Sequence, residues 1–258
     1  MSFIELERKD GVAVVRLNRP EKLNSLTGEM ILSLTDLFRG FAADPSLRAV
    51  ILTGAGEKAF CVGTDIGELV DRSEAEALNI SKRGQSLCNL IERSPVPVIA
   101  AINGLAVGGG CELALACHMR LATANASFSL PETRLGIVPG YGGTQRMPRE
   151  VGMSRALELM LAGREVSSAD AERLGLINRV LEAASLLQEA ESLAQDIARL
   201  APLAIRACLE SVRVGSELPL DEGLAVEARL FAALFETADM REGTRAFLEK
   251  RKPVFKGT

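Results

Sequence analysis

The sequence predicts an α/β fold followed by a helical C-terminal region. Short apolar segments of strand length alternate with segments of helical spacing as far as about residue 182. Beyond that point, apolar residues recur every three or four positions, which is typical of helices. The chain has 258 residues, of which 47% are hydrophobic, so it can bury a large core.

A β-hairpin and an amphipathic helix are expected at the N-terminus. Residues 3–7 alternate between apolar and polar side chains, Asp10–Gly11 is a turn sequence, and residues 12–17 are rich in β-formers. The sequence Asn-Arg-Pro at 18–20 ends the second strand. Apolar residues then follow helical spacing over residues 27–42.

Buried strands and helices alternate in the middle of the chain. Residues 49–53, 97–103 and 119–123 read as strands, and the first two of these are apolar runs. Helical spacing covers residues 73–93, between the first two strands. A short helix that carries Glu112 precedes the third strand.

Only helices are expected in the last quarter of the chain. Its first apolar residues step by three or four, as in a helix: Leu186, Ala190, Leu193, Ile197 and Leu200. Pro202 can open a second helix, and residues 221–236 and 239–250 predict two more. We therefore divide the chain into a core of residues 1–195 and a helical region of residues 196–258.

Composition narrows the possible partners and compartments. The formal net charge of −4 and the 25% of charged residues give no case for nucleic-acid or membrane-surface binding. The longest apolar run, residues 98–102, is too short to span a bilayer, and the N-terminus has no signal-peptide pattern. Five cysteines without a C-x-x-C pair, together with one histidine, favour reduced thiols in the cytoplasm and no metal site.

The stretch AVGGGCELALA, residues 106–116, runs three glycines into a helix with an acid, Glu112, in its first turn. One interpretation is a tight turn between strand and helix. A dinucleotide fingerprint needs G-x-G-x-x-G and a P-loop ends in G-K-[ST], and neither pattern is present. We favour an oxyanion hole, because N–H groups at a helix N-terminus lack intrahelical partners and carry partial positive charge.

Two further stretches contain groups that fit such a hole. Residues 58–66 end at a predicted helix start, where the N–H of Thr64 follows the flexible Gly63 and can serve as a second donor. Residues 130–143 contain Glu132, which either caps a helix after Pro131 or supplies a second acid. Two converging carboxyl groups would repel each other, so burial and repulsion would raise the pKa of at least one toward neutrality.

Six blocks, in order along the chain, resemble the crotonase family, also called the enoyl-CoA hydratase/isomerase superfamily. They are LNRPEKLNSLT (17–27), KAFCVGTDI (58–66), NGLAVGGGCELALACH (103–118), SLPETRLGIVPGYGGTQRM (129–147), ELMLAGREVSSADAERLGLINRV (158–180) and REGTRAFLEKRKPVFKG (241–257). The resemblance implies a spiral core of repeated β-β-α turns, and C-terminal helices that form trimers, which usually pair into hexamers. It also implies an acyl-CoA substrate and no separate metal or redox cofactor.

The resemblance also implies site residues. In the family two backbone N–H groups hold the thioester oxygen, and these match Thr64 and Gly109, while the two acids of its hydratases match Glu112 and Glu132. The implied contacts with substrate or coenzyme A are Lys22, Leu23, Asn24, Val62, Thr64, Asp65, Ile66, Gly109, Phe247 and Lys250. Phe247 and Lys250 match positions that reach a neighbouring subunit's coenzyme A, although a solvated helix face is the simpler interpretation of Lys250.

The oxyanion loop departs from the family pattern. Many members read A-G-A-D where this chain reads V-G-T-D at 62–65, so we expect the methyl and hydroxyl of Thr64 to narrow or polarise the thioester site. Tyr141, the only tyrosine, falls in the glycine-rich turn near the pocket, where we interpret it as structural.

The activity that the resemblance implies is addition of water across the 2,3 double bond of a trans-2-enoyl-CoA, which gives a 3-hydroxyacyl-CoA. Alternatives within the family are an isomerase, a dehydratase of the carnitinyl-CoA type and a thioesterase, and the paired acids favour the hydratase. The alternative outside enzymes is a non-catalytic member that binds acyl-CoA or RNA. The paired glutamates argue against the first of these, and the lack of a basic run in the sequence argues against the second.

Overall fold

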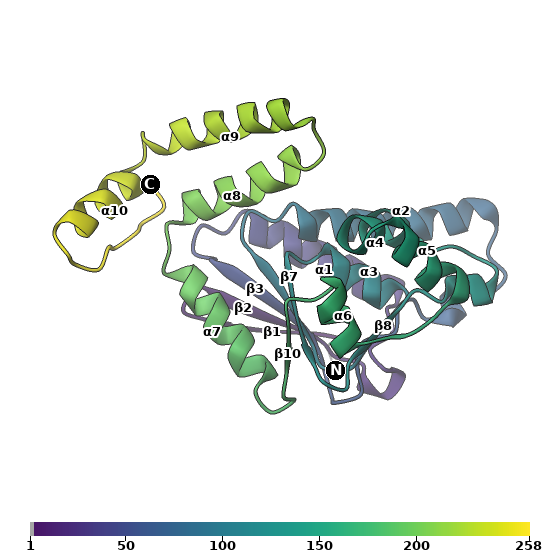
Figure 1. The fold of residues 1–258 in the computed structure, drawn as a ribbon. Coiled ribbons are helices and arrows are strands. Elements are labelled where there is room, and N and C mark those ends of the chain that lie inside the picture. The colour runs from purple at the N-terminus through teal and green to yellow at the C-terminus, as the bar shows by residue number, and fades with distance from the viewer. Residues whose placement is uncertain (1–2) are drawn as a thin grey trace.

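Residues 3–258 are described by a computed structural model, and within them the strands form two sheets (Figure 1). The larger sheet has six strands in the order β1 (Ile4–Lys9), β2 (Val12–Leu17), β3 (Ala49–Gly54), β5 (Val98–Ile102), β7 (Met119–Thr123) and β10 (Arg179–Leu181). β1 and β2 form the predicted antiparallel hairpin. The other neighbours in this sheet are parallel, as expected for an α/β fold.

Strands of the smaller sheet alternate along the chain with strands of the larger sheet. The smaller sheet consists of β4 (Ala59–Cys61), β6 (Leu105–Val107), β8 (Ser127–Ser129) and β9 (Val166–Ser167). Three successive turns each contain a strand of the larger sheet, a strand of the smaller sheet and a helix, and these turns are β3–β4–α2, β5–β6–α3 and β7–β8–α4. The predicted spiral of β-β-α turns is therefore confirmed.

The first two helices of the core begin at ordinary capping sequences. The Thr27 hydroxyl accepts a hydrogen bond from Met30 N at the start of α1 (Gly28–Ala42), and Ser73 and Glu76 form a capping box at the start of α2 (Glu74–Glu92). These two helices confirm the segments predicted at 27–42 and 73–93. The remaining core helices are α3 (Gly109–Ala116), α4 (Gly143–Val151), α5 (Met153–Ala162) and α6 (Ser168–Leu174).

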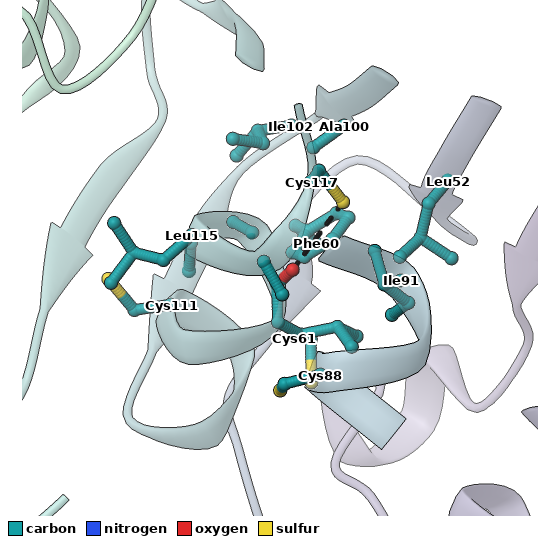
Figure 2. Close-up of a cluster of buried hydrophobic side chains, with 14 of the residues drawn as sticks. Leu52, Phe60, Cys61, Cys88, Ile91, Ala100, Ile102, Cys111, Leu115 and Cys117 are labelled. Atoms are coloured by element: carbon teal, nitrogen blue, oxygen red, sulfur yellow. Dashed lines mark hydrogen bonds between the residues drawn. The ribbon is translucent and has the colours of Figure 1, made fainter. Parts of the chain in front are cut away.

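The main core lies between the sheets and helices α1 to α4. Phe60 of β4 is fully buried, and Figure 2 shows it near Cys61, Cys88, Ile91 and Cys117. Burial raises the pKa of the Cys61 and Cys117 thiols to about 12, so both stay protonated and pack as apolar groups. All five cysteines are free thiols, and four of them are buried.

The C-terminal helices are found where the apolar spacing placed them. α7 (Leu186–Ala198) packs its buried face on the larger sheet. α8 (Pro202–Gly215), α9 (Leu220–Leu234) and α10 (Ala238–Leu248) project away from the core in Figure 1. The boundary predicted after residue 195 falls inside α7, so the division into two regions stays a prediction. No helix in residues 3–258 has the length and apolar character needed to cross a membrane.

Candidate active site

The glycine run forms the turn between β6 and α3 and leaves backbone N–H groups uncovered. Gly108 has φ +52° and ψ −126°, a combination that residues with a side chain rarely adopt. α3 begins at Gly109, whose N–H donates to no acceptor within residues 3–258. Because a helix N-terminus carries partial positive charge, this N–H is suited to an oxygen that develops negative charge.

The loop after β4 brings a second N–H to the same place. A Cβ built on Gly63 would lie 2.8 Å from Gly109 N, so this loop touches the start of α3. Leu26 N donates to Gly63 O at 2.7 Å. Since the C=O and N–H of a trans peptide point in opposite directions, this bond turns the N–H of Thr64 away from Leu26. The two predicted donors, on Thr64 and Gly109, therefore lie on segments that are in contact.

Glu112 lies in the first turn of α3 and is only 2% exposed. Its Oε1 accepts hydrogen bonds from the backbone N–H groups of Tyr141 and Gly143, each at 2.7 Å. Burial raises the pKa of this carboxyl, and the two backbone bonds oppose that shift. The bonds fix the orientation of Glu112 and favour its charged form.

Glu132 lies against the glycine turn that precedes α3. It is the first residue of a short 3-10 helix (Glu132–Leu135), and a Cβ on Gly108 would lie 2.9 Å from its Oε1. Its Oε2 is buried and has no hydrogen-bond partner in the described part of the chain. Burial raises its pKa to about 7, and the charge of Glu112 adds to the shift. The alternative role as a helix cap is not found, because no side chain caps this helix.

Tyr141 contacts several of these groups, which its interpretation as a structural residue did not anticipate. Thr64 Oγ1 donates a hydrogen bond to Tyr141 Oη at 2.8 Å. The ring is buried between Gly109 and Gly84 of α2, and a Cβ on Gly84 would overlap it. Sequence reasoning missed Gly84 altogether. A glycine inside a helical segment was the available signal, since glycine disfavours helices.

The residues predicted to contact coenzyme A near the N-terminus differ in their surroundings. Asn24 is fully buried, and its amide donates to Ala55 O and Ala59 O, so its side chain is used inside the protein. Lys22 is exposed, and Leu23 lines a groove of about 290 Å³ beside Lys58. The exposed lysine thus remains available to a ligand, whereas the backbone N–H groups of residues 22–25 are paired within the protein.

The other residues predicted to contact the substrate or coenzyme A lie in two places, the oxyanion loop and the C-terminal helix α10. Asp65 accepts from Arg19 Nη1 at 2.7 Å and from Gly67 N at 3.1 Å, so its carboxylate shapes the oxyanion loop. In that loop Val62 is partly exposed and Ile66 is largely exposed. Phe247 is 83% exposed on α10, which lies far from α3 in Figure 1, and Lys250 follows that helix and is exposed. Their contact with a neighbouring subunit's ligand stays a prediction.

Comparison with known proteins gives matches over nearly the full length of the chain. The family model described as enoyl-CoA hydratase/isomerase matches residues 7–258. Crotonyl-CoA hydratase from Syntrophomonas wolfei is 40% identical over 252 residues, which are 98% of this chain and 97% of the relative. (E)-Benzylidenesuccinyl-CoA hydratase from Thauera aromatica is 40% identical over 254 residues, which are 98% and 99% of the two chains.

A solved structure of enoyl-CoA hydratase from Bacillus anthracis matches with a TM-score of 0.97 and 39% identity, and the match covers 100% of both chains. The fold, the order of the motifs and these full-length matches lead to one conclusion. The chain belongs to the enoyl-CoA hydratase/isomerase family, as its six sequence blocks predicted.

Proposed function

We propose that the protein is an enoyl-CoA hydratase, a hydro-lyase that adds water across the 2,3 double bond of a trans-2-enoyl-CoA. The observation that carries this proposal is a pair of buried acids beside the unpaired N–H groups of the glycine turn. Glu112 lies in the first turn of α3, Glu132 lies against Gly108, and the two are close enough for the charge of Glu112 to raise the pKa of Glu132. The names of the relatives, which are hydratases of acyl-CoA thioesters, support the same reaction.

The proposed role of the N–H groups is to activate the thioester. The carbonyl oxygen accepts hydrogen bonds from Thr64 N and Gly109 N and gains negative charge as the reaction proceeds. Charge on this oxygen withdraws electrons from the conjugated double bond, so C3 becomes electrophilic. A donor of this kind typically stabilises the transition state by about 3 kcal/mol.

The proposed roles of the acids follow from their different surroundings. Glu112, which two N–H donors favour as a carboxylate, takes one proton from water while the water oxygen bonds to C3. Glu132, which burial keeps protonated up to about pH 7, delivers its proton to C2 from the same face. A proton passed from Glu112 back to Glu132 through solvent restores the enzyme. Groups of the chain account for both proton transfers, so the proposal includes no metal or redox cofactor.

The test is hydration of crotonyl-CoA, followed by the loss of absorbance of the conjugated enoyl thioester. Glu112→Gln and Glu132→Gln should each lower kcat by about 10²- to 10⁴-fold, the usual contribution of a general acid or base. Glu158→Gln, which changes an exposed glutamate paired with Arg164, is the matched control and should keep the parent rate. Parent rates in both site variants, or migration of the double bond in place of hydration, would contradict the proposal.

The acyl group is a separate question within the proposal. Relatives named for a crotonyl thioester and for a benzylidenesuccinyl thioester are both 40% identical to this chain, so identity does not choose between a small and a bulky acyl group. A panel of enoyl-CoA thioesters of increasing length, compared by kcat/KM, would rank them.

Assembly into trimers or hexamers is also proposed. Large apolar side chains are exposed along the C-terminal helices, including Val212, Leu220, Phe231, Phe235, Phe247 and Leu248. Such a patch favours burial against another copy. Light scattering should give three or six times the chain mass of 27.6 kDa, and a monomer at micromolar concentration would contradict this.

A cytoplasmic location is proposed from the thiols. The five free cysteines include an exposed one, Cys208, which fits a reducing compartment. Cell fractionation would test this location, and recovery from an oxidising compartment would contradict it.

A further inference from the structure

Tyr141 links two segments of the candidate site, the oxyanion loop that carries Thr64 and helix α3, which carries both Gly109 and Glu112. Its backbone N–H donates to Glu112 Oε1 at 2.7 Å, and its phenol accepts from Thr64 Oγ1 at 2.8 Å. Its ring lies against the start of α3, where a Cβ on Gly109 would be 3.2 Å from the ring carbons. One residue therefore contacts the acid, the oxyanion loop and the helix that carries the other oxyanion donor.

Neighbouring groups hold Tyr141 in place. Ser81 Oγ of α2 donates to Gly140 O at 2.7 Å, which fixes the peptide just before Tyr141. Arg146 Nη1 donates to the carbonyl of Tyr141 at 3.1 Å, and the ring fills the space over Gly84. The phenol thus cannot swing away without moving α2 or α4. Its bond with Thr64 adds a direct link between the 140–143 turn and the oxyanion loop, which within residues 3–258 otherwise meet only through their contacts with α3.

We propose that Tyr141 is a positioning residue, whose hydrogen bond with Thr64 fixes the distance between the Thr64 donor and the Glu112 carboxylate of α3. This inference rests on the proposed function. When the donors hold the thioester oxygen, that distance decides whether water on Glu112 reaches C3. A misplacement of about 1 Å can cost about 100-fold in rate.

The same link gives a reason for the departure at position 64. With alanine there, the buried phenol of Tyr141 would lose the partner that it has in this chain, and an unpaired buried hydroxyl costs about 1–3 kcal/mol. Three residues therefore depend on one another: the hydroxyl of Thr64 pairs with the phenol of Tyr141, and Gly84 leaves the space that the tyrosine ring fills.

A double-variant cycle tests the inference by kinetics. Thr64→Val and Tyr141→Phe each remove one hydroxyl and keep the size of the side chain. Each should lower kcat for crotonyl-CoA about five- to tenfold with KM within about twofold, in line with the loss of one hydrogen bond. If the two act through one bond, the double variant should be no slower than the slower single variant. Losses that multiply in the double variant would overturn the inference.

Thr53→Val is the matched control for this cycle. It also removes a buried threonine hydroxyl that donates a 2.7 Å bond, to Ala101 O, but it does so within the larger sheet. The control should keep the parent kcat, although it can lower the melting temperature. A loss of kcat equal to that of Thr64→Val would mean that general destabilisation explains both, and would overturn the inference.

Spectroscopy tests the link without any turnover. The chain has one tyrosine and no tryptophan, so its near-ultraviolet tyrosine band and its emission report Tyr141 alone. Thr64→Val should shift this band relative to the parent protein, and Thr53→Val should leave it unchanged. An unshifted band in Thr64→Val would overturn the inference even if that variant is slow.

Binding of butyryl-pantetheine separates the inference from the proposed function. This thioester has no adenine to absorb the exciting light and no double bond to hydrate. It should change the emission of Tyr141 in the parent protein and change it less in Thr64→Val. If the parent protein hydrates no enoyl thioester, the proposed function fails. The difference in emission change between the parent protein and Thr64→Val still decides the inference, because equal changes in both proteins would overturn it.

Discussion

The carboxyl group of Glu132 lies against the backbone of Gly108, where an added Cβ would be 2.9 Å from Oε1. Gly108 also has φ +52°, so glycine is favoured at this position both by conformation and by space. The next residue starts α3 and carries one of the proposed oxyanion donors. A side chain at position 108 would therefore displace an acid and a donor together.

Gly108→Ala should lower kcat for crotonyl-CoA by about 10- to 100-fold, because small displacements at a reacting centre have effects of this size. The control is Gly175→Ala, which changes a glycine of φ +79° that has no atom within 4 Å of its missing Cβ. Both variants should lose stability from backbone strain, on the order of 1–3 kcal/mol. Gly108→Ala should lose more, because its ψ of −126° lies outside the left-handed helical region that Gly175 occupies, but only Gly108→Ala should lose activity. Equal activities would contradict the proposed geometry.

The raised pKa of Glu132 makes stability depend on pH. In the unfolded chain the pKa of this carboxyl is near its ordinary value of 4.5, and in the folded chain burial raises the pKa to about 7. The folded state therefore holds the proton more tightly, and stability falls as pH rises from about 4.5 to about 7 and levels off above. The loss is on the order of 3 kcal/mol.

Urea unfolding at pH 5 and pH 8, at one protein concentration, measures this loss. Glu132→Gln removes the titrating group, so its free energy of unfolding should fall less between the two pH values than that of the parent protein. The same fall in both proteins would show that Glu132 does not titrate in this range.

Activity should depend on pH through the same group. The proposed acid must be protonated, so kcat/KM should decrease above about pH 7, where Glu132 loses its proton. It should also decrease at low pH, where Glu112 gains a proton and can no longer act as a base. The two apparent pKa values belong to the coupled pair of acids. A pH profile that is flat between pH 6 and 9 would argue against proton delivery by Glu132.

Much of the fold could be predicted because its long elements have clear periodicity. The β1–β2 hairpin, α1, α2, α7, α9 and α10 were found within one or two residues of their predicted bounds, and α8 begins at the predicted Pro202. The strands of the smaller sheet were missed, because β4, β6 and β8 have only three residues each. Three residues are too few to show alternation, and their pairing depends on residues far away in the sequence.

Some features of the candidate site could also be predicted from the sequence, and others could not. Gly109, Glu112 and the Thr64 loop could be proposed because each signal is local: glycines, a helix start and an acid in the first turn. The fit of Tyr141 over Gly84 joins residues that lie far apart in the sequence, so only the folded chain reveals it. The burial that raises the pKa of Glu132 is likewise a property of the packed structure.

Arg146→Gln should weaken both stability and catalysis. The Arg146 side chain is mostly buried and pairs with Glu92 at 2.8 Å, with Asn89 at 2.8 Å and with the carbonyl of Tyr141 at 3.1 Å. Its loss should cost about 1–3 kcal/mol and loosen the loop that holds Glu112. Arg149→Gln breaks two exposed interactions, a pair with Glu217 and a hydrogen bond to Gln145 O, and should cost less than about 1 kcal/mol. Thermal unfolding and kcat would compare them, and indistinguishable variants would contradict this role.

Asp65→Asn should lower kcat more than it changes stability. The Asp65 carboxylate receives Arg19 Nη1 at 2.7 Å and Gly67 N at 3.1 Å, and the hydrogen bond from Arg19 lowers its pKa. Asparagine keeps the size but removes the charge, so the Arg19 anchor of the loop weakens. The backbone bonds from Leu26 to this loop remain, so the loop should keep its fold but hold the N–H of Thr64 less firmly.

We expect kcat of Asp65→Asn to fall about tenfold, since a hydrogen bond between charged groups contributes about 1.5–3 kcal/mol and only part of it acts on the donor. Asp170→Asn is the control, because Asp170 also pairs with an arginine and accepts at the start of a helix, but on the exposed surface of α6. Steady-state rates with crotonyl-CoA should drop for the first and not for the second. If Asp65→Asn kept the parent rate, the charge on this loop would have no part in holding the oxyanion donor, and the backbone alone would suffice.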